Sequence, residues 1–142
     1  MEMTDSKRGQ LFAEFLGSGD SLRVYEGKDL VFASRKDRLL PLVEYIDTAA
    51  TQHTGVFVFD KIIGNAAALL CIKASCREVS SPLGSRLAAT TLDKHGIEYR
   101  LSRIVPYIQK SEGEGMCPME ELSIDKEPEE FYRLVKEKMG RP

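Results

Sequence analysis

Histidine and cysteine are scarce in this chain, and their spacing matches no ordinary zinc site. The 142 residues contain two histidines, His53 and His95, and three cysteines, Cys71, Cys76 and Cys117. Neither histidine stands at a recognisable metal-ligand spacing from a cysteine, and the C-x4-C pair matches no common zinc pair. We therefore expect no bound metal. The odd number of cysteines fits a reducing compartment, with Cys71 buried among apolar neighbours.

Long apolar runs and a strong net charge are also lacking. The longest mainly apolar stretch free of charge, residues 62–72, is far shorter than the roughly 20 residues that span a bilayer. The first ten residues mix charges of both signs with no apolar run behind them, so no secretory signal is visible. Twenty Lys and Arg against 22 Asp and Glu give a net charge of −2, which offers nucleic acid no attractive field. We expect a cytoplasmic protein without a membrane or nucleic-acid partner.

The size of the chain predicts one domain with a proper core. A chain with 42% hydrophobic residues and this length can bury roughly 70% of its unfolded surface. We expect a single domain over residues 1–142, with residues 1–20 as an N-terminal extension or helix and the core over about 21–137.

Apolar patterns predict the order of the elements. A short helix over residues 10–16 precedes a β-hairpin of runs 22–25 and 30–33, with Gly27 in the turn. Asp37 can cap a helix over residues 38–50. The apolar run of residues 56–59 indicates a central strand, and an Ala-rich buried helix follows it. Further on we expect a strand over 77–80, a helix from Pro82 to His95, a strand over 97–108 and a last helix from Glu127. This order favours a three-layer α/β/α fold with a mixed sheet.

Several short segments resemble a known family. The segments are DKIIGNAAALL, LDKHGIEYR, VPYIQ and above all GMCPME, spread over residues 60–120. They resemble DUF1893, a small prokaryotic family classed as a domain of unknown function that shares the cytidine deaminase-like fold. The resemblance covers roughly residues 22–134. It implies the fold and brings no established reaction.

The zinc ligands of the deaminases are absent from the matching positions. Their H-A-E signature is best matched by Asn65-Ala66-Ala67, and their P-C-x-x-C by residues 82–86, Pro-Leu-Gly-Ser-Arg. Every ligand position and the catalytic Glu are lost, so a thiolate-rich zinc site cannot form. The resemblance therefore argues against zinc-dependent deamination and leaves open whether the protein is an enzyme.

The cleft of such a scaffold can still bind a ligand. The resemblance implies that two helix N-termini converge near the carboxyl edge of the sheet, where exposed N–H groups attract an anion. The alternative is that Gly64 only permits close helix packing and that Ser85 is an ordinary first-turn residue. The residues that we expect to bind the ligand are Gly64, Asn65, Gly84 and Ser85, with Lys61 and Arg86 as counter-charges.

Asp60 and Cys117 are the candidates for chemistry. Asp60 ends the apolar strand, where α/β sheets place functional groups, although it can equally cap the next helix. Cys117 precedes Pro118 in a glycine-rich loop, so its sulfur can sit at a helix N-terminus that favours a thiolate. Glu120, three residues on, can complete a capping arrangement. Against a reactive thiol, no His stands beside Cys117 and several glutamates surround it, so a structural Cys-Pro turn is the alternative.

Three functions remain open, in this order. The first is a domain without zinc that binds a nucleotide-type or other anionic small molecule, with no cofactor certain. The second is a thiol-dependent, redox enzyme that uses Cys117, and it requires the GMCPME loop to fold over the Asp60 edge of the sheet. The third is an interaction module that assembles as a homo-oligomer.

Overall fold

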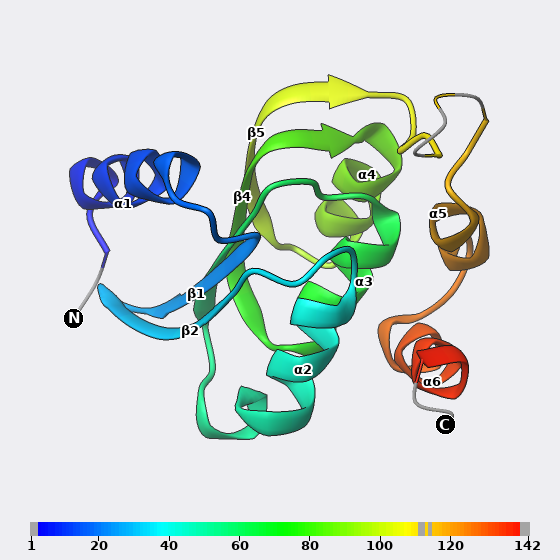
Figure 1. Ribbon diagram of the computed structural model, residues 1–142, viewed down its shortest axis with the longest axis horizontal. Helices are drawn as coiled ribbons and strands as arrows, with labels where there is room; N and C mark the ends of the chain where they lie inside the picture. The colour runs from blue at the N-terminus through cyan, green and yellow to red at the C-terminus, as the bar shows by residue number, and fades with distance from the viewer. Residues whose placement is uncertain (1–2, 111–112, 114, 140–142) are drawn as a thin grey trace.

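A computed structural model describes residues 3–110, 113 and 115–139, and its centre is a mixed sheet of five strands (Figure 1). The strand order is β2-β1-β3-β4-β5. Strand β1 runs antiparallel to β2 and β3, whereas β3, β4 and β5 are mutually parallel. The strands are β1 (Leu22–Glu26), β2 (Asp29–Ser34), β3 (Val56–Asp60), β4 (Cys76–Ser85) and β5 (Glu98–Val105). The expectation of an α/β fold with a mixed sheet is confirmed.

Six α-helices accompany the sheet within the described residues. They are α1 (Asp5–Gly17), α2 (Leu40–Thr48), α3 (Asn65–Lys73), α4 (Arg86–Lys94), α5 (Pro118–Ser123) and α6 (Pro128–Met139), with a 3-10 turn, η1 (Ala50–Gln52), after α2. None of these described helices has both the length and the apolar character that crossing a bilayer requires.

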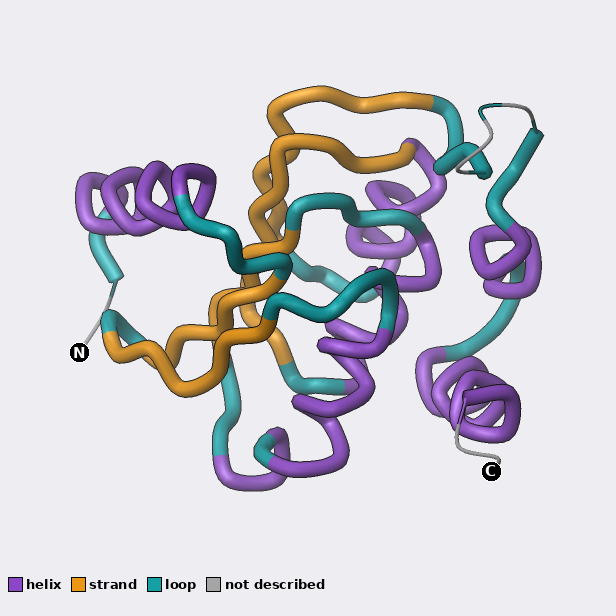
Figure 2. Tube along the Cα trace, in the orientation of Figure 1, coloured by secondary structure: helices purple, strands orange, loops and turns teal. Residues whose placement is uncertain are grey.

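Strand β3 explains how the helices divide between the two faces of the sheet. All five of its residues are buried, as the apolar run predicts for a central strand. Phe57 and Phe59 point toward α1, where they join a cluster with Phe15, and Val56 and Val58 point to the other face. Figures 1 and 2 show α1 alone on one side of the strands and α2, α3 and α4 on the other.

The Ala-rich helix α3 is the centre of the second face. Its residues from Asn65 through Cys71 are all buried, and it packs against α2, α4, α5 and α6. Small side chains let these neighbours approach on several sides, so the helix is apolar all round. The end of β3 and the start of α3 are consequently surrounded by segments from distant parts of the chain.

The hairpin prediction is confirmed, and the helix boundaries differ in detail. Gly27 takes a positive φ of 58° in the turn between β1 and β2. Helix α1 is longer than the pattern predicted, whereas α2 begins later and has no side-chain cap, so Asp37 does not cap it. The backbone carbonyl of Asp37 accepts a hydrogen bond from Leu40 N at 3.3 Å instead.

The prediction that Pro82 begins a helix is wrong. Strand β4 continues through Pro82 to Ser85, and α4 begins at Arg86. Two neighbours hold the segment extended. On one side it pairs with β5, and on the other Ile63 N donates to Leu83 O at 2.9 Å. Both partners are distant in the sequence, so the local pattern of a proline followed by helix formers could not reveal them.

Candidate ligand site at the carboxyl end of β3

A cavity of about 800 Å³ opens at the carboxyl end of β3. It exceeds three other cavities of the fold, of about 440, 320 and 500 Å³. The segments just before α2 and α3 and the first turn of α3 contribute to it, together with residues 108–110 and 117–120. The apolar part of its wall consists of Leu39, Ile62, Ala66, Ala67, Ile108, Pro118 and Met119, and the polar part includes Arg38, Asp60, Lys110, Cys117 and Glu120.

Asp60, the last residue of β3, is one of two buried acids that line this cavity, with Glu120. Its side chain is 9% exposed, and Oδ1 accepts a hydrogen bond from Ile62 N at 3.3 Å. Burial raises the pKa of Asp60 to about 7, against the smaller opposing effect of the backbone N–H groups of Ile62 and Lys61 and of the Lys61 charge. The carboxyl group therefore changes its protonation state near neutral pH.

The neighbouring cation does not turn toward Asp60. Lys61 Nζ donates to Ser18 O at 3.3 Å and lies 4.7 Å from the centre of the Phe15 ring. These contacts direct the ammonium group toward α1. Lys61 lines the cavity, but its charge is engaged elsewhere.

Cys117 lines the same cavity as Asp60. It is the N-cap residue of α5, with Pro118 at the first helical position, as the sequence indicated. Its backbone N donates to Ile108 O at 2.8 Å, which ties the loop to the end of β5, and its side chain is half-buried. The structure thus brings together the two residues that the sequence singled out for chemistry. The segment between β5 and Cys117 includes residues 111, 112 and 114, which lie outside the described residues.

Glu120 is the cavity residue whose structural role the sequence did not reveal. It is 2% exposed, its Oε1 accepts a hydrogen bond from Asn65 N at 2.5 Å, and its Oε2 accepts one from Ile108 N at 3.1 Å. The carboxylate caps the start of α3 rather than its own helix, where the dipole favours a negative charge. No local signal could reveal this, because Glu120 lies 55 positions away from Asn65.

Gly64 and Asn65 serve this internal contact. A Cβ atom at Gly64 would lie 2.6 Å from Glu120 Oε1 and 2.8 Å from Ile108 Cγ1, so a larger residue would force these side chains to shift. Asn65 Nδ2 donates to Ser123 O at 3.1 Å and to Ser123 Oγ at 2.9 Å, and its Oδ1 accepts a hydrogen bond from Thr91 Oγ1. Gly64 lines the cavity, whereas the Asn65 side chain is used in holding α5 and α4 against α3.

The remaining residues that the sequence assigned to ligand binding do not line this cavity. A Cβ at Gly84 would lie 2.6 Å from Leu101 Cδ1, so that glycine permits β5 to pack closely. Ser85 Oγ accepts a hydrogen bond from Ala88 N at 3.0 Å and caps α4, which is the alternative role considered for it. Arg86 is exposed at the first turn of α4. The starts of α3 and α4 do lie side by side, because Ile63 and Gly84 form a β-bridge and Ser85 N donates to Ile63 O at 3.0 Å. Neither start is open, since Glu120 caps α3 and Ser85 caps α4.

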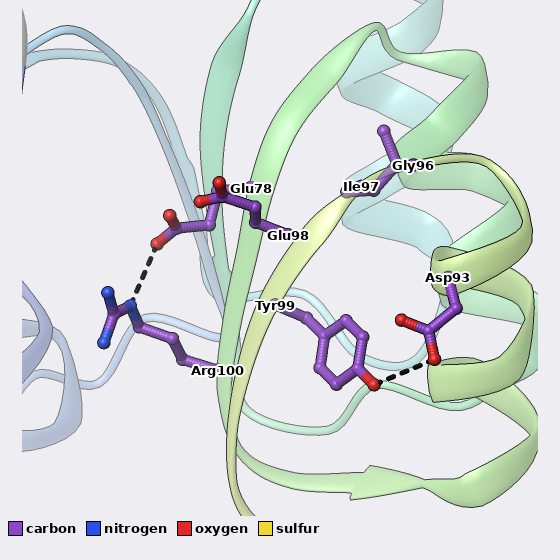
Figure 3. Close-up of a pocket in the computed structure, with 7 residues that line it drawn as sticks. All are labelled: Glu78, Asp93, Gly96, Ile97, Glu98, Tyr99 and Arg100. Carbon is purple, nitrogen blue, oxygen red and sulfur yellow. Dashed lines mark hydrogen bonds and ion pairs between the residues drawn. The ribbon is translucent and has the colours of Figure 1, made fainter.

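A second polar cluster lies on the opposite, α1-facing side of the sheet. Glu78 in β4 is 2% exposed, and its Oε2 lies 3.0 Å from Arg8 Nε and 3.6 Å from Arg100 Nε, in an ion pair without an aligned hydrogen bond. Figure 3 shows the carboxyl group of Glu98 beside that of Glu78. Burial raises the pKa of Glu78, and the two arginines oppose this effect. On the other side of β5, Tyr99 OH donates to Asp93 Oδ2 at 3.2 Å.

No group of three His, Cys, Asp or Glu side chains that could share a metal ion is found over residues 3–110, 113 and 115–139. Fold and cavity thus define an α/β protein with a mixed five-stranded sheet and a carboxyl-lined pocket at the end of its central strand.

The chain belongs to the family described as Domain of unknown function (DUF1893), whose model, TM1506, matches residues 12–139. The resemblance inferred from the sequence is confirmed. The crystal structure of a DUF1893 family protein (TM1506) from Thermotoga maritima is similar, with a TM-score of 0.87 and 26% identity. The match covers 97% of this chain and 93% of that chain. No curated protein matches the sequence.

Proposed function

We propose that this DUF1893 protein binds a nucleotide-type small molecule in the Asp60 cavity. One observation carries the proposal: a buried carboxyl group with a pKa of about 7 lines a largely apolar cavity of about 800 Å³. Ligand sites are typically cavities of roughly 300–1,000 Å³ with apolar walls and a few placed polar groups. A titratable group shifted by burial in such a place supports a functional role.

The chemistry of the wall supports a heterocyclic base with an anionic group attached. A carboxyl near its pKa can both donate and accept hydrogen bonds, which suits the adjacent N–H and N atoms of a base edge. The aliphatic side chains can cover the faces of a ring. Arg38 and Lys110 line the same cavity and supply positive charge for a phosphate.

The cytidine deaminase-like fold is part of this proposal. Helix α1 on one face and α2, α3 and α4 on the other support the three-layer α/β/α arrangement. Asn65, Leu83 and Arg86 stand at the matched ligand positions, so the proposed function is not zinc-dependent deamination. Binding of a base-like ligand would then retain the pocket of the scaffold without its metal chemistry.

Thermal unfolding in the presence of nucleosides, nucleotides and sugar phosphates tests the proposal. A free ligand concentration of about 100 times Kd adds roughly 2.7 kcal/mol to the free energy of unfolding. We expect at least one nucleotide to stabilise the wild type and to lose most of its effect on Asp60→Asn. Asp93→Asn, an exposed acid on α4, is the matched control and should respond like the wild type. If no compound raises the melting temperature, the proposal fails.

A thiol-dependent enzyme is the second candidate, because Cys117 and Asp60 line one cavity. In its carboxylate form Asp60 can accept a proton from a group bound beside it, and a thiolate is the reactive form of cysteine. Incubating the protein with a thiol-reactive substrate analogue and mapping the adduct by mass spectrometry separates this candidate from simple binding. An adduct confined to Cys117, and lost in competition with a bound nucleotide, would favour it.

A further inference from the structure

The carboxylate of Glu120 already occupies the N-terminus of α3. Both carboxylate oxygens accept backbone hydrogen bonds, from Asn65 N at 2.5 Å and from Ile108 N at 3.1 Å. Glu120 is 2% exposed, so water hardly competes for these two hydrogen bonds. A helix start with N–H groups and a positive dipole end is a ready anion site, and here the chain itself supplies the anion.

The surroundings are built for this side chain. A Cβ at Gly64 would lie 2.6 Å from Glu120 Oε1, so any larger residue there would displace the carboxylate from its present position. Ser123 Oγ donates to Glu120 O at 2.6 Å, and Asn65 Nδ2 donates to Ser123 O at 3.1 Å. These bonds fix α5 to the start of α3 from two directions, so the carboxylate is held in place rather than swinging in from solvent.

We propose that Glu120 is the specificity-determining residue of the cavity, an internal anion that keeps the acidic group of a ligand away from the start of α3. The inference rests on the proposed function. Because Glu120 lines the cavity beside Gly64, its charge repels a phosphate or carboxylate at that end. The cations that line the cavity lie on other segments, Arg38 just before α2 and Lys110 after β5. The acidic group of the ligand therefore binds on their side, and its base edge faces Asp60.

Removal of the Glu120 side chain should turn the start of α3 into an open anion site. We expect Glu120→Ala to be destabilised, and acetate to raise its melting temperature more than sodium chloride does at equal ionic strength. The wild type should show only the general difference between the two salts, which is subtracted from the response of the variant. Glu121→Ala, which removes the exposed neighbouring acid on α5, is the matched control and should behave as the wild type does. An advantage of acetate over chloride in Glu120→Ala that is no larger than in the wild type would overturn the inference.

If Glu120→Ala does not fold in chloride, refolding it in acetate decides the same point. Circular dichroism should then show recovery of the native signal in acetate only, and recovery in neither salt would count against the inference.

Ligand selectivity is a second measurement, and substitution of a purely structural residue would not change it. Glu120→Gln keeps the shape and removes the charge, so the ratio of the Kd for adenosine to the Kd for adenosine monophosphate should rise about tenfold, the size of a partly screened charge interaction. An unchanged ratio would overturn the specificity role. If neither probe binds the wild type and no compound of the thermal screen stabilises it, the proposed function fails, while the acetate experiment still decides whether Glu120 occupies an anion site.

Discussion

Two buried carboxyl groups lie on opposite faces of the same sheet and have opposite surroundings. Glu78, under α1, is paired with Arg8 at 3.0 Å and with Arg100 at 3.6 Å. Asp60, at the end of β3, faces a cavity, and within the described part of the chain it makes no ion pair. Burial raises the pKa of both groups. Only for Glu78 do ion pairs with nearby arginines oppose this increase in pKa.

By this difference, Glu78 is a structural charge, and Asp60 has the surroundings that the proposed ligand site requires. A buried acid that is paired with cations is compensated, and its removal or replacement is a matter of stability. A buried acid without a cation partner retains the full free-energy cost of burying its charge. Where such an acid also faces a cavity, the combination is the one found at ligand and catalytic sites. Mutations of the two carboxyl groups should therefore differ in pH dependence and in their response to ligands.

The largest effect is expected from breaking the structural pair. Arg8→Met leaves Glu78 buried without its nearest cation, which should cost about 3–5 kcal/mol of the free energy of unfolding at neutral pH. The loss should be smaller at a second, acidic pH, because burial raises the pKa of Glu78 and protonation removes the unpaired charge. Urea unfolding of the variant at both pH values measures this, with the exposed Gln10→Met on the same helix as the control.

The double variant Arg8→Met with Glu78→Met should recover most of the loss, because an apolar pair of similar volume removes the unpaired charge. If the single variant costs less than about 1 kcal/mol, or if the double variant recovers nothing, Arg8 and Glu78 are not the pair that holds α1 to the sheet.

Asp60→Asn is expected to change the pH dependence rather than only the size of the stability. The pKa of Asp60 rises from 3.8 in the unfolded chain to about 7 in the folded protein. The folded state therefore retains a proton that the unfolded state releases, and stability falls as the pH rises from about 4 to about 7. The contribution lost is on the order of 2–4 kcal/mol, and it stays absent above pH 7.

The neutral amide of Asp60→Asn should lack this component. The difference in free energy of unfolding between variant and wild type, measured by urea at several pH values from 4 to 8, should therefore increase with pH and level off above 7. Other titrating groups cancel in the difference. A difference that is flat across this range would show that Asp60 is not perturbed as the cavity requires.

Much of the fold follows from local patterns in the sequence. The apolar run that becomes β3 predicts a central strand, and Gly27 between two apolar runs predicts the hairpin of β1 and β2. Asp60 could be singled out because it stands at the end of that strand. Each of these inferences depends on residues that are neighbours in the chain, so the sequence contains the whole signal.

What the sequence did not reveal depends on distant partners. Residues 82–85 form a strand because Ile63 and β5 bond to them from both sides. Glu120 looked like the cap of its own short helix, but it reaches across 55 positions to Asn65. Glu78 gave no signal, since a glutamate on a strand is ordinarily exposed. Pairing across the fold decides all three, and a single sequence without an alignment of relatives cannot supply it.

The smallest effect on stability is expected at Cys117, where the comparison of buried and cavity-facing groups extends to thiols. Cys117→Ser should change the free energy of unfolding by less than about 0.5 kcal/mol, because its side chain is only half-buried. Cys71 and Cys76 are buried, and burial raises the pKa of Cys76 to about 12 and that of Cys71 well above its usual value. Iodoacetamide should therefore label Cys117 first in the folded protein, by a factor of more than about 100, since each unit of pKa lowers the thiolate fraction tenfold. Mass spectrometry of timed samples measures the three rates.

If the carboxylate of Asp60 faces the thiol across the cavity, Asp60→Asn should speed the labelling of Cys117 two- to threefold near pH 8 by removing a like charge. A slower reaction would instead identify Asp60 as the base that assists the thiol, and an equal rate would separate the two residues functionally.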